Sequence, residues 1–166
     1  SGEKAALMTI VADAGPIISF ARAGYDEVLR AVFPEIIIPE AVCAEIAFQG
    51  AGRPGASLVQ QEEWIRVVAI CRREGVDRLP KNLGLGEREA IALAEELNHS
   101  LLIDDRAGRK EAESRNMVYF GSLRVLKEAK DRGLLCEVTP IMDALRGAGL
   151  RMGEMLYQTF IREMGE

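Results

Sequence analysis

The chain has 166 residues, of which 48% are hydrophobic, and its formal net charge is −5. This length suits one domain with a substantial core, the hydrophobic share excludes a disordered chain, and no apolar run approaches the roughly 20 residues that span a bilayer. The negative charge argues against a general nucleic-acid binder with a broad basic surface. It does not exclude a nuclease, because such an enzyme collects acidic metal ligands at its centre.

The N-terminus and the cysteines favour a cytoplasmic protein. Residues 1–7 are interpreted as a cloning remnant or a flexible N-terminus, with Met8 as the natural start, and they lack the pattern of a signal peptide. Cys43, Cys71 and Cys136 are odd in number and widely spaced, which argues against a disulfide framework or a zinc knuckle. Their apolar neighbours favour buried packing. We therefore expect a reducing, cytoplasmic location without membrane contact.

The first half of the chain alternates short apolar runs with stretches of helical periodicity. In chain order the pattern predicts a strand at 8–12, two helices over 16–33 separated at Gly24, a strand at 36–38, a helix at 39–48 and a strand at 64–70. The glycine-rich segment 50–55 predicts a mobile loop. It lacks the Gly-Lys-Ser/Thr ending of a phosphate-binding loop, so nucleotide hydrolysis is not expected.

The second half continues the alternation. The pattern predicts a helix at 85–97, a strand at 101–103, a helix at 106–115, a strand at 117–120 and helices at 123–131, 140–145 and 153–164. Strands that alternate with helices imply one α/β domain over residues 1–166, with a central parallel sheet and a C-terminal helical extension at 136–166. In such a sheet, ligands bind outside the carboxyl ends of the strands.

Three aspartates follow predicted strands. Asp13 precedes a Gly-Pro turn, where it is either a turn or cap residue or part of a site. Asp104 and Asp105 are adjacent carboxylates that repel each other, and either a helix cap with nearby arginines or a divalent cation would relieve that repulsion. The placement at strand ends favours a site, and both interpretations stay open for each residue.

Two glutamates lie on or near the inward faces of predicted helices. Glu87 is one turn before Ala90 and Ile91 on the apolar stripe of its helix, whereas Glu89 lies off that stripe. Its position also suits a negative charge at a helix N-terminus, which is the alternative. Glu45 sits at the edge of the inward face of its own helix, and a solvated glutamate is the alternative there.

Hard oxygen ligands from several strands and helices suit Mg²⁺ or Mn²⁺. Such a cluster can orient a water, lower its pKa and stabilise the leaving oxygen of a phosphodiester. His99, the only histidine, lies in a polar turn, which removes Ser-His-Asp hydrolase chemistry. A receiver-like phosphate acceptor is disfavoured because its acidic pair would follow the first strand, and here the pair comes late.

Four segments in this order resemble the PIN domain family. They are Val11-Ala12-Asp13 before Gly15-Pro16, Pro39 to Ile46, Gly86 to Ala94, and Leu101 to Arg109. The last two look closest to a toxin-like prokaryotic branch. The resemblance implies a three-layer α/β/α PIN-like fold and a Mg²⁺- or Mn²⁺-dependent ribonuclease. It also implies a homodimer, often held inactive by a small antitoxin protein.

The resemblance and the strand-end positions together assign the predicted site. The catalytic residues expected are Asp13, Glu45, Glu87 and Asp105, the metal contacts are Asp13, Glu87, Asp104 and Asp105, and the substrate contacts are Arg106 and Arg109. Ala14 and Ile103 replace small hydroxyl residues usual in the family, which would help to hold metal-bound water. They motivate an alternative, a catalytically weak PIN fold that acts as a nucleic-acid- or protein-binding regulatory module.

Overall fold

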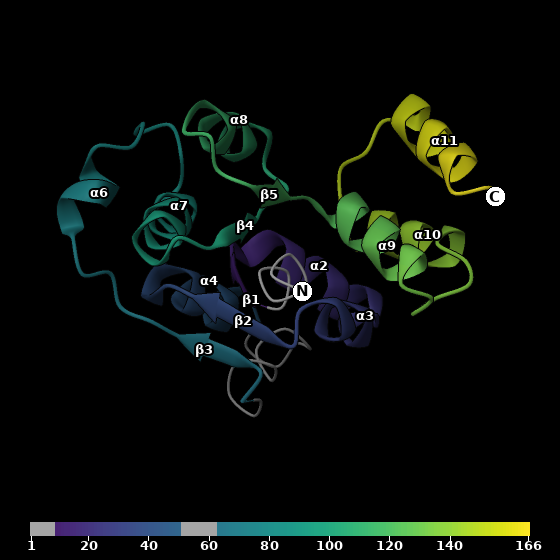
Figure 1. The fold of residues 1–166 in the computed structure, drawn as a ribbon, viewed down its shortest axis with the longest axis horizontal. Helices are drawn as coiled ribbons and strands as arrows, with labels where there is room; N and C mark the ends of the chain where they lie inside the picture. The colour runs from purple at the N-terminus through teal and green to yellow at the C-terminus, as the bar shows by residue number, and fades with distance from the viewer. Residues whose placement is uncertain (1–8, 51–62) are drawn as a thin grey trace.

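A computed structural model describes residues 9–50 and 63–166, and within these ranges five strands form one fully parallel sheet. The strands are β1 (Thr9–Ala12), β2 (Glu35–Ile38), β3 (Ile65–Val67), β4 (Ser100–Leu102) and β5 (Tyr119–Phe120). Their order across the sheet is β3-β2-β1-β4-β5, as Figure 1 shows. The predicted parallel sheet is confirmed. Residues 1–7, the start at Met8 and most of the glycine-rich loop lie outside the described residues.

The helices alternate with the strands as predicted. They are α2 (Ala14–Ala23), α3 (Asp26–Val32), α4 (Glu40–Gly50), α6 (Arg73–Asp77), α7 (Leu85–Leu97), α8 (Arg106–Ser114), α9 (Ser122–Asp131), α10 (Thr139–Gly147) and α11 (Glu154–Glu163). Of these, only α6 was not predicted, because it has five residues and buries a single side chain, that of Val76. None of the helices in the described ranges is long and apolar enough to cross a bilayer.

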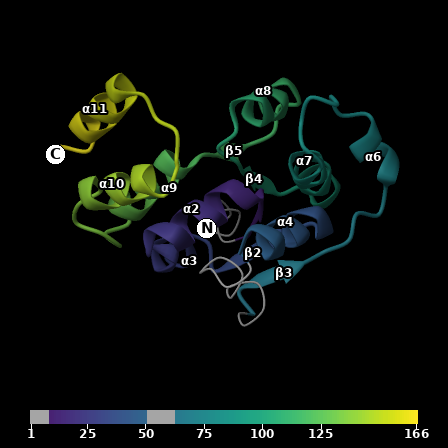
Figure 2. The ribbon, with the colours of Figure 1, turned by 180° about the vertical axis from the view of Figure 1, so that it is seen from behind.

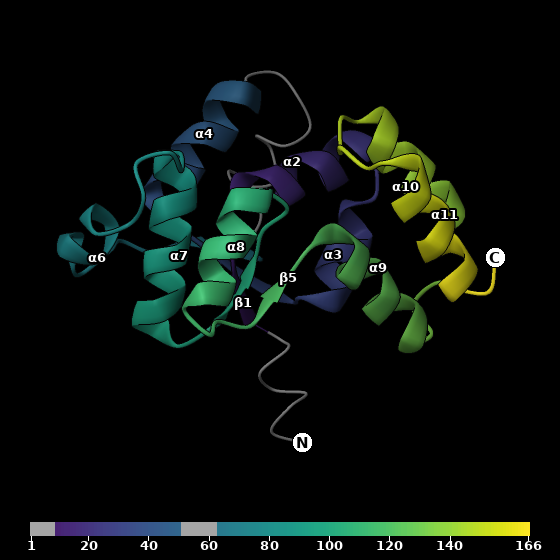
Figure 3. The same ribbon diagram turned by 90° about the horizontal axis from the view of Figure 1, so that it is seen from above.

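Helices cover the sheet from both sides, which gives the three layers expected of an α/β/α domain. Seen from above, α7 and α8 lie side by side on one side of the sheet, and α3 and α9 lie together on the other (Figure 3). The strands are buried because both faces are covered, and Val11 and Ile37 are examples of nearly inaccessible side chains. At one margin, the rings of Phe33 and Phe120 meet edge to face at 5.6 Å.

The edge strand β3 ends earlier than predicted. The sequence indicated a strand to Ile70, but pairing with β2 stops after Val67, apart from one hydrogen bond from the Val68 N–H to the Ile38 carbonyl. Pro39 follows Ile38 and has no N–H to donate, so the ladder cannot continue. The cysteine prediction was also wrong in part, because Cys71 and Cys136 are exposed in connecting segments.

The C-terminal helices are fastened by Glu166. Viewed from behind, α9, α10 and α11 form a group at the end of the molecule opposite α6 (Figure 2). The Glu166 carboxylate accepts hydrogen bonds from the Val138 and Thr139 N–H groups, from the Thr139 hydroxyl and from Lys130. Burial raises its pKa, but these donors outweigh that effect and hold the pKa at about 2. The carboxylate thus closes the start of α10.

Glu166→Ala is expected to lower the free energy of unfolding by about 2 kcal/mol, because charged hydrogen bonds are lost and the start of α10 is uncovered. Since the folded pKa is depressed, this stabilisation is present above about pH 4.5 and is lost as pH falls towards 2. Urea unfolding at pH 7 and at pH 3 measures both effects. Glu163→Ala, an exposed change on α11, is the control and should be neutral.

Candidate metal-binding active site

The carboxyl ends of β1 and β4 form the point where the strand order reverses. From β1 the chain continues to β2 and β3 on one side, whereas β4 and β5 lie on the other. In open α/β sheets a ligand crevice forms at such a point. Asp13 directly follows β1, and its backbone N–H donates to the Leu102 carbonyl at the end of β4, with a distance of 2.9 Å. Asp13 is therefore held between the ends of the two central strands.

Asp13 is the most buried carboxylate of the predicted set, with 6% of its surface exposed. Burial, together with the charges of Glu87, Glu45 and Asp105, raises its pKa to about 7, although a hydrogen bond from the Ala14 N–H lowers it. Although Asp13 occupies the N-cap position of α2, its side chain makes no capping hydrogen bond. The simple cap interpretation therefore does not account for this residue.

Gly86 brings Glu45 next to Asp13. It lies in the first turn of α7, and a Cβ atom built on it would stand 2.8 Å from Glu45 Oε2 and 3.8 Å from Asp13 Oδ1. Only a residue without a side chain leaves this space to the carboxylates. Glu45 is half-buried on α4, and burial raises the pKa of its carboxyl group.

Glu87 and Asp105 combine a local capping bond with membership of the acidic group. Glu87 Oε2 accepts a hydrogen bond from the Gly84 N–H at 3.2 Å, and Asp105 Oδ2 accepts one from the Gly108 N–H at 2.8 Å. Burial raises the pKa of Glu87, as do the charges of Asp105 and Glu45, while the Gly84 N–H lowers it. These bonds confirm the capping interpretation for both residues, and their part in a metal site stays a prediction. We call Asp13, Glu45, Glu87 and Asp105 the acidic cluster.

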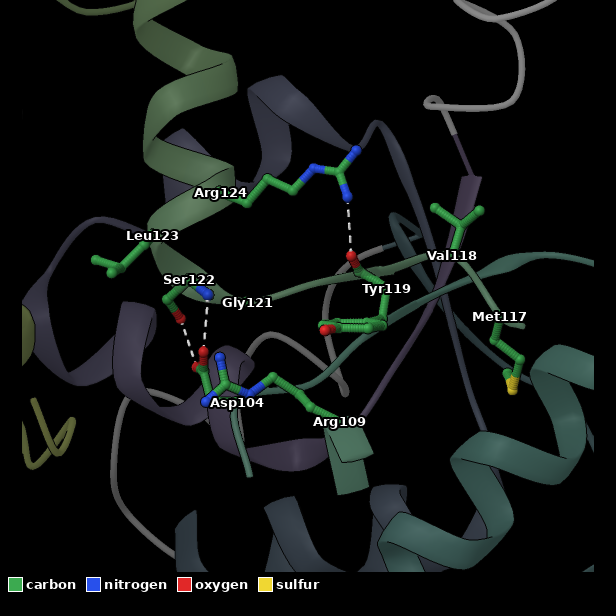
Figure 4. Close-up of a pocket in the computed structure, with 9 residues that line it drawn as sticks. All are labelled: Asp104, Arg109, Met117, Val118, Tyr119, Gly121, Ser122, Leu123 and Arg124. Carbon is green, nitrogen blue, oxygen red and sulfur yellow. Dashed lines mark hydrogen bonds between the residues drawn. The ribbon is translucent and has the colours of Figure 1, made fainter. Parts of the chain in front are cut away.

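Asp104 has different partners from the acidic cluster. Its Oδ1 accepts a hydrogen bond from the Ser122 N–H at 2.7 Å, and its Oδ2 accepts one from the Ser122 hydroxyl at 2.5 Å (Figure 4). Burial raises the pKa of Asp104, whereas Ser122 and the nearby Arg109 lower it. These bonds tie the end of β4 to the start of α9. A direct metal contact by Asp104 stays a prediction.

The predicted substrate arginines, Arg106 and Arg109, begin α8 beside the acidic cluster. Arg106 is exposed in the first turn of this helix, directly after Asp105. Arg109 is half-buried, and Figure 4 shows its guanidinium group turned towards Asp104. Their role in binding a substrate stays a prediction.

Sequence reasoning missed the role of Glu89. This residue is 5% exposed, and its carboxylate accepts hydrogen bonds from the Ala41 N–H of α4 at 3.0 Å and from Arg73 at 2.7 Å. The helical wheel placed it off the apolar stripe, but α7 is buried on more than one side, by the sheet and by α4. Its spacing of four residues from buried Leu93 was the available signal. Glu89 fastens α4 to α7, and with them Glu45 to Glu87.

The acidic cluster has the chemistry of a divalent-cation site. Its members offer hard oxygen donors, and mutual repulsion around a buried carboxylate is relieved by a bound cation. Among residues 9–50 and 63–166, however, no three acidic, histidine or cysteine side chains are already arranged to hold an ion together. Ligation therefore requires side-chain rotation, which is open to Glu45 and Glu87 because both are half-buried.

Comparison with known proteins identifies the family. A family model described as a PIN domain, DUF3368, matches residues 9–166. The chain belongs to the PIN domain family. Among solved structures, a PilT N-terminus domain protein, SSO1118, from the hyperthermophilic archaeon Sulfolobus solfataricus P2 is 20% identical, with a TM-score of 0.49. That match covers 74% of this chain and 93% of the other. No curated protein matches.

Membership of the PIN family places the chain in a superfamily of nucleases. PIN domains are generally hydrolases and are typically dependent on divalent metals. The matched residues include the acidic cluster and the helices α10 and α11.

Asp13→Asn is expected to stabilise the metal-free protein by as much as about 4 kcal/mol above pH 7, because it removes a buried charge whose folded pKa is raised. Because the folded pKa of this acid is raised, the destabilisation by the Asp13 charge is absent below about pH 4 and reaches its full size as pH rises past 7. Denaturant unfolding in a chelator at pH 3.5 and 8 measures it. A gain of equal size at both values would contradict the raised pKa.

Gly86→Ala is expected to push the Glu45 carboxylate aside at small cost in stability, because the clashing atom is the end of a flexible side chain. Displaced ligands typically weaken metal binding by about tenfold or more. Calorimetric titration with Mn²⁺ measures the loss. Gly84→Ala is the matched control, since its Cβ would meet Glu87 only at an ordinary 3.9 Å. Unchanged Mn²⁺ affinity in Gly86→Ala would show that Glu45 takes no part in binding.

Proposed function

We propose that this PIN domain is a divalent-metal-dependent endoribonuclease that hydrolyses RNA phosphodiester bonds with Mg²⁺ or Mn²⁺. The observation that carries the proposal is the buried Asp13 carboxylate at the end of β1, whose pKa is raised to about 7 with contributions from the charges of Glu87, Glu45 and Asp105. A protein gains nothing in stability from such crowding without a cation. A site that binds a divalent ion accounts for it.

In this proposal each residue has a role that follows from its position. Asp13, Glu87 and Asp105 hold the ion, and Glu45 orders the water next to it. When bound, the ion would supply the positive charge that activates a water and stabilises the leaving oxygen. Arg106, exposed beside Asp105, faces the solvent from which a phosphodiester would approach. Asp104 supports the site indirectly, because its bonds to Ser122 position the segment that carries Asp105.

The family resemblance extends the proposal to partners. We propose a homodimer, and a small antitoxin protein that holds the enzyme inactive. Both are motivated by the toxin-like motifs at Gly86 to Ala94 and Leu101 to Arg109.

A second candidate is a catalytically weak PIN fold that acts as a regulatory binding module. Two observations favour it. Ala14 and Ile103 are buried apolar residues where family members usually carry hydroxyls. Within the described residues no metal-binding set is preassembled. Calorimetry with Mn²⁺ separates the candidates, because the module predicts no binding at millimolar metal.

The purified chain is expected to cleave single-stranded RNA only when Mg²⁺ or Mn²⁺ is present. Asp13→Asn and Glu87→Gln should each lower the rate by about 100-fold or more, since each removes a charge needed at the ion. Gel analysis of labelled RNA, with and without chelator, measures this. Glu113→Gln, an exposed change on α8, is the matched control and should keep full activity. Cleavage that survives the chelator or Asp13→Asn would refute the enzyme proposal.

A further inference from the structure

An open pocket of about 590 Å³ lies next to the acidic cluster, at the carboxyl end of β5. Its lining includes Asp104, Arg109, Tyr119, Ser122 and Arg124 (Figure 4). Asp104 borders this pocket, and its neighbour Asp105 belongs to the acidic cluster. The pocket therefore begins one residue away from the proposed cleavage site. Its size falls within the range of roughly 300–1,000 Å³ that is usual for small-ligand sites.

The charges in the pocket differ from those of the acidic cluster. Its one carboxylate, Asp104, has both oxygens bound by Ser122. The Arg109 side chain donates no hydrogen bond and forms no salt bridge to any residue in the described part of the chain, although its guanidinium group is turned towards Asp104 (Figure 4), so its N–H donors are available to a ligand. Arg124 is held in place, because it donates to the Tyr119 carbonyl at 3.0 Å and lies 3.9 Å from the centre of the Phe120 ring. Two arginines thus leave this pocket with a positive balance.

Tyr119 adds a flat aromatic surface to the same pocket. The side chain is half-buried, and its hydroxyl makes no hydrogen bond within residues 9–50 and 63–166. Figure 4 shows the ring inside the pocket, on the side of the strand that faces Asp104 and Arg109. An aromatic ring and an arginine with available N–H donors in one pocket can bind an unpaired base and its phosphate, because the base stacks on the ring and the phosphate accepts from the guanidinium group.

We propose that this pocket binds one nucleotide of single-stranded RNA, next to the phosphate that is cleaved. The base stacks on the Tyr119 ring and the phosphate of that nucleotide is bound by Arg109. Arg124 fixes the strand segment that carries the ring. The inference rests on the proposed function for the position of the scissile phosphate, but the binding itself does not require cleavage. It predicts that the protein selects unpaired RNA over a duplex, whose bases are already stacked.

The test measures RNA binding without cleavage. A labelled single-stranded RNA of about ten nucleotides is titrated into the Asp13→Asn protein in chelator, and fluorescence anisotropy reports the affinity. Arg109→Gln and Tyr119→Leu, added one at a time, are each expected to weaken binding about tenfold, from the loss of one phosphate contact and of one stacked base. Tyr119→Phe keeps the ring and should bind within about twofold of the parent. Arg151→Gln is the matched charge control, because Arg151 is exposed and lies outside the pocket.

The outcomes separate this proposal from the proposed function. Loss of binding in Arg109→Gln and Tyr119→Leu, with both controls intact, supports the pocket even if the unmodified chain cleaves no RNA. If the unmodified chain cleaves RNA but both pocket variants bind RNA with parental affinity, the nucleotide-binding proposal is wrong and the ribonuclease proposal stands. An equal loss in Arg151→Gln overturns it as well, because general charge would then explain binding. If inorganic polyphosphate competes as strongly as unlabelled RNA, base stacking on Tyr119 does not contribute to binding, and the proposal is wrong. Arg109 is not part of the hydrophobic core, so Arg109→Gln is expected to fold. If Tyr119→Leu does not fold, the RNA affinity of Arg109→Gln alone tests the proposal.

Discussion

Burial of the Asp13 carboxylate between the ends of β1 and β4 is the constraint on which the rest of the site depends. Asp13 is buried where the strand order reverses, and this burial raises its pKa, with smaller contributions from the charges of Glu87, Glu45 and Asp105. The backbone N–H of Asp13 is bonded to the Leu102 carbonyl at the end of β4, which holds this residue between the two central strands. A bound cation would neutralise these carboxylate charges, and the same arrangement would then be a metal-binding site.

The helices α4 and α7, which contain Glu45 and Glu87, are held together by residues outside the predicted catalytic set. Glu89 is buried between α7 and α4 and bonds to the backbone of α4, which sets Glu45 relative to Glu87. Gly86 leaves the space into which the Glu45 carboxylate extends. Removal of either feature would alter the site without touching a predicted catalytic residue. The contact between α4 and α7 therefore sets the positions of Glu45 and Glu87 relative to each other.

Asp104 and Asp105 show how adjacent residues serve two neighbouring regions. Asp105 caps α8 and contributes its charge to the acidic cluster, whereas Asp104 binds Ser122 and borders the pocket with Arg109 and Tyr119. The negative region and the positive pocket meet at this dipeptide. A nuclease that binds a polyanion needs both, a cation-binding centre for the chemistry and positive side chains to hold the flanking chain.

The sequence alone determined the alternation of strands and helices, the parallel sheet and the positions of Asp13, Asp104 and Asp105 after strands, because hydrophobic periodicity and strand-end placement are local properties. It also indicated the PIN resemblance. Only the tertiary structure decided that Glu89 is buried, since α7 has neighbours on several sides that its own periodicity does not reveal. The same holds for the bonds between Asp104 and Ser122, residues 18 positions apart in the chain. The packing of α4, α7 and β1 determines which carboxylates lie close enough to shift one another's pKa. This packing involves residues far apart in the chain, so local sequence patterns do not predict it.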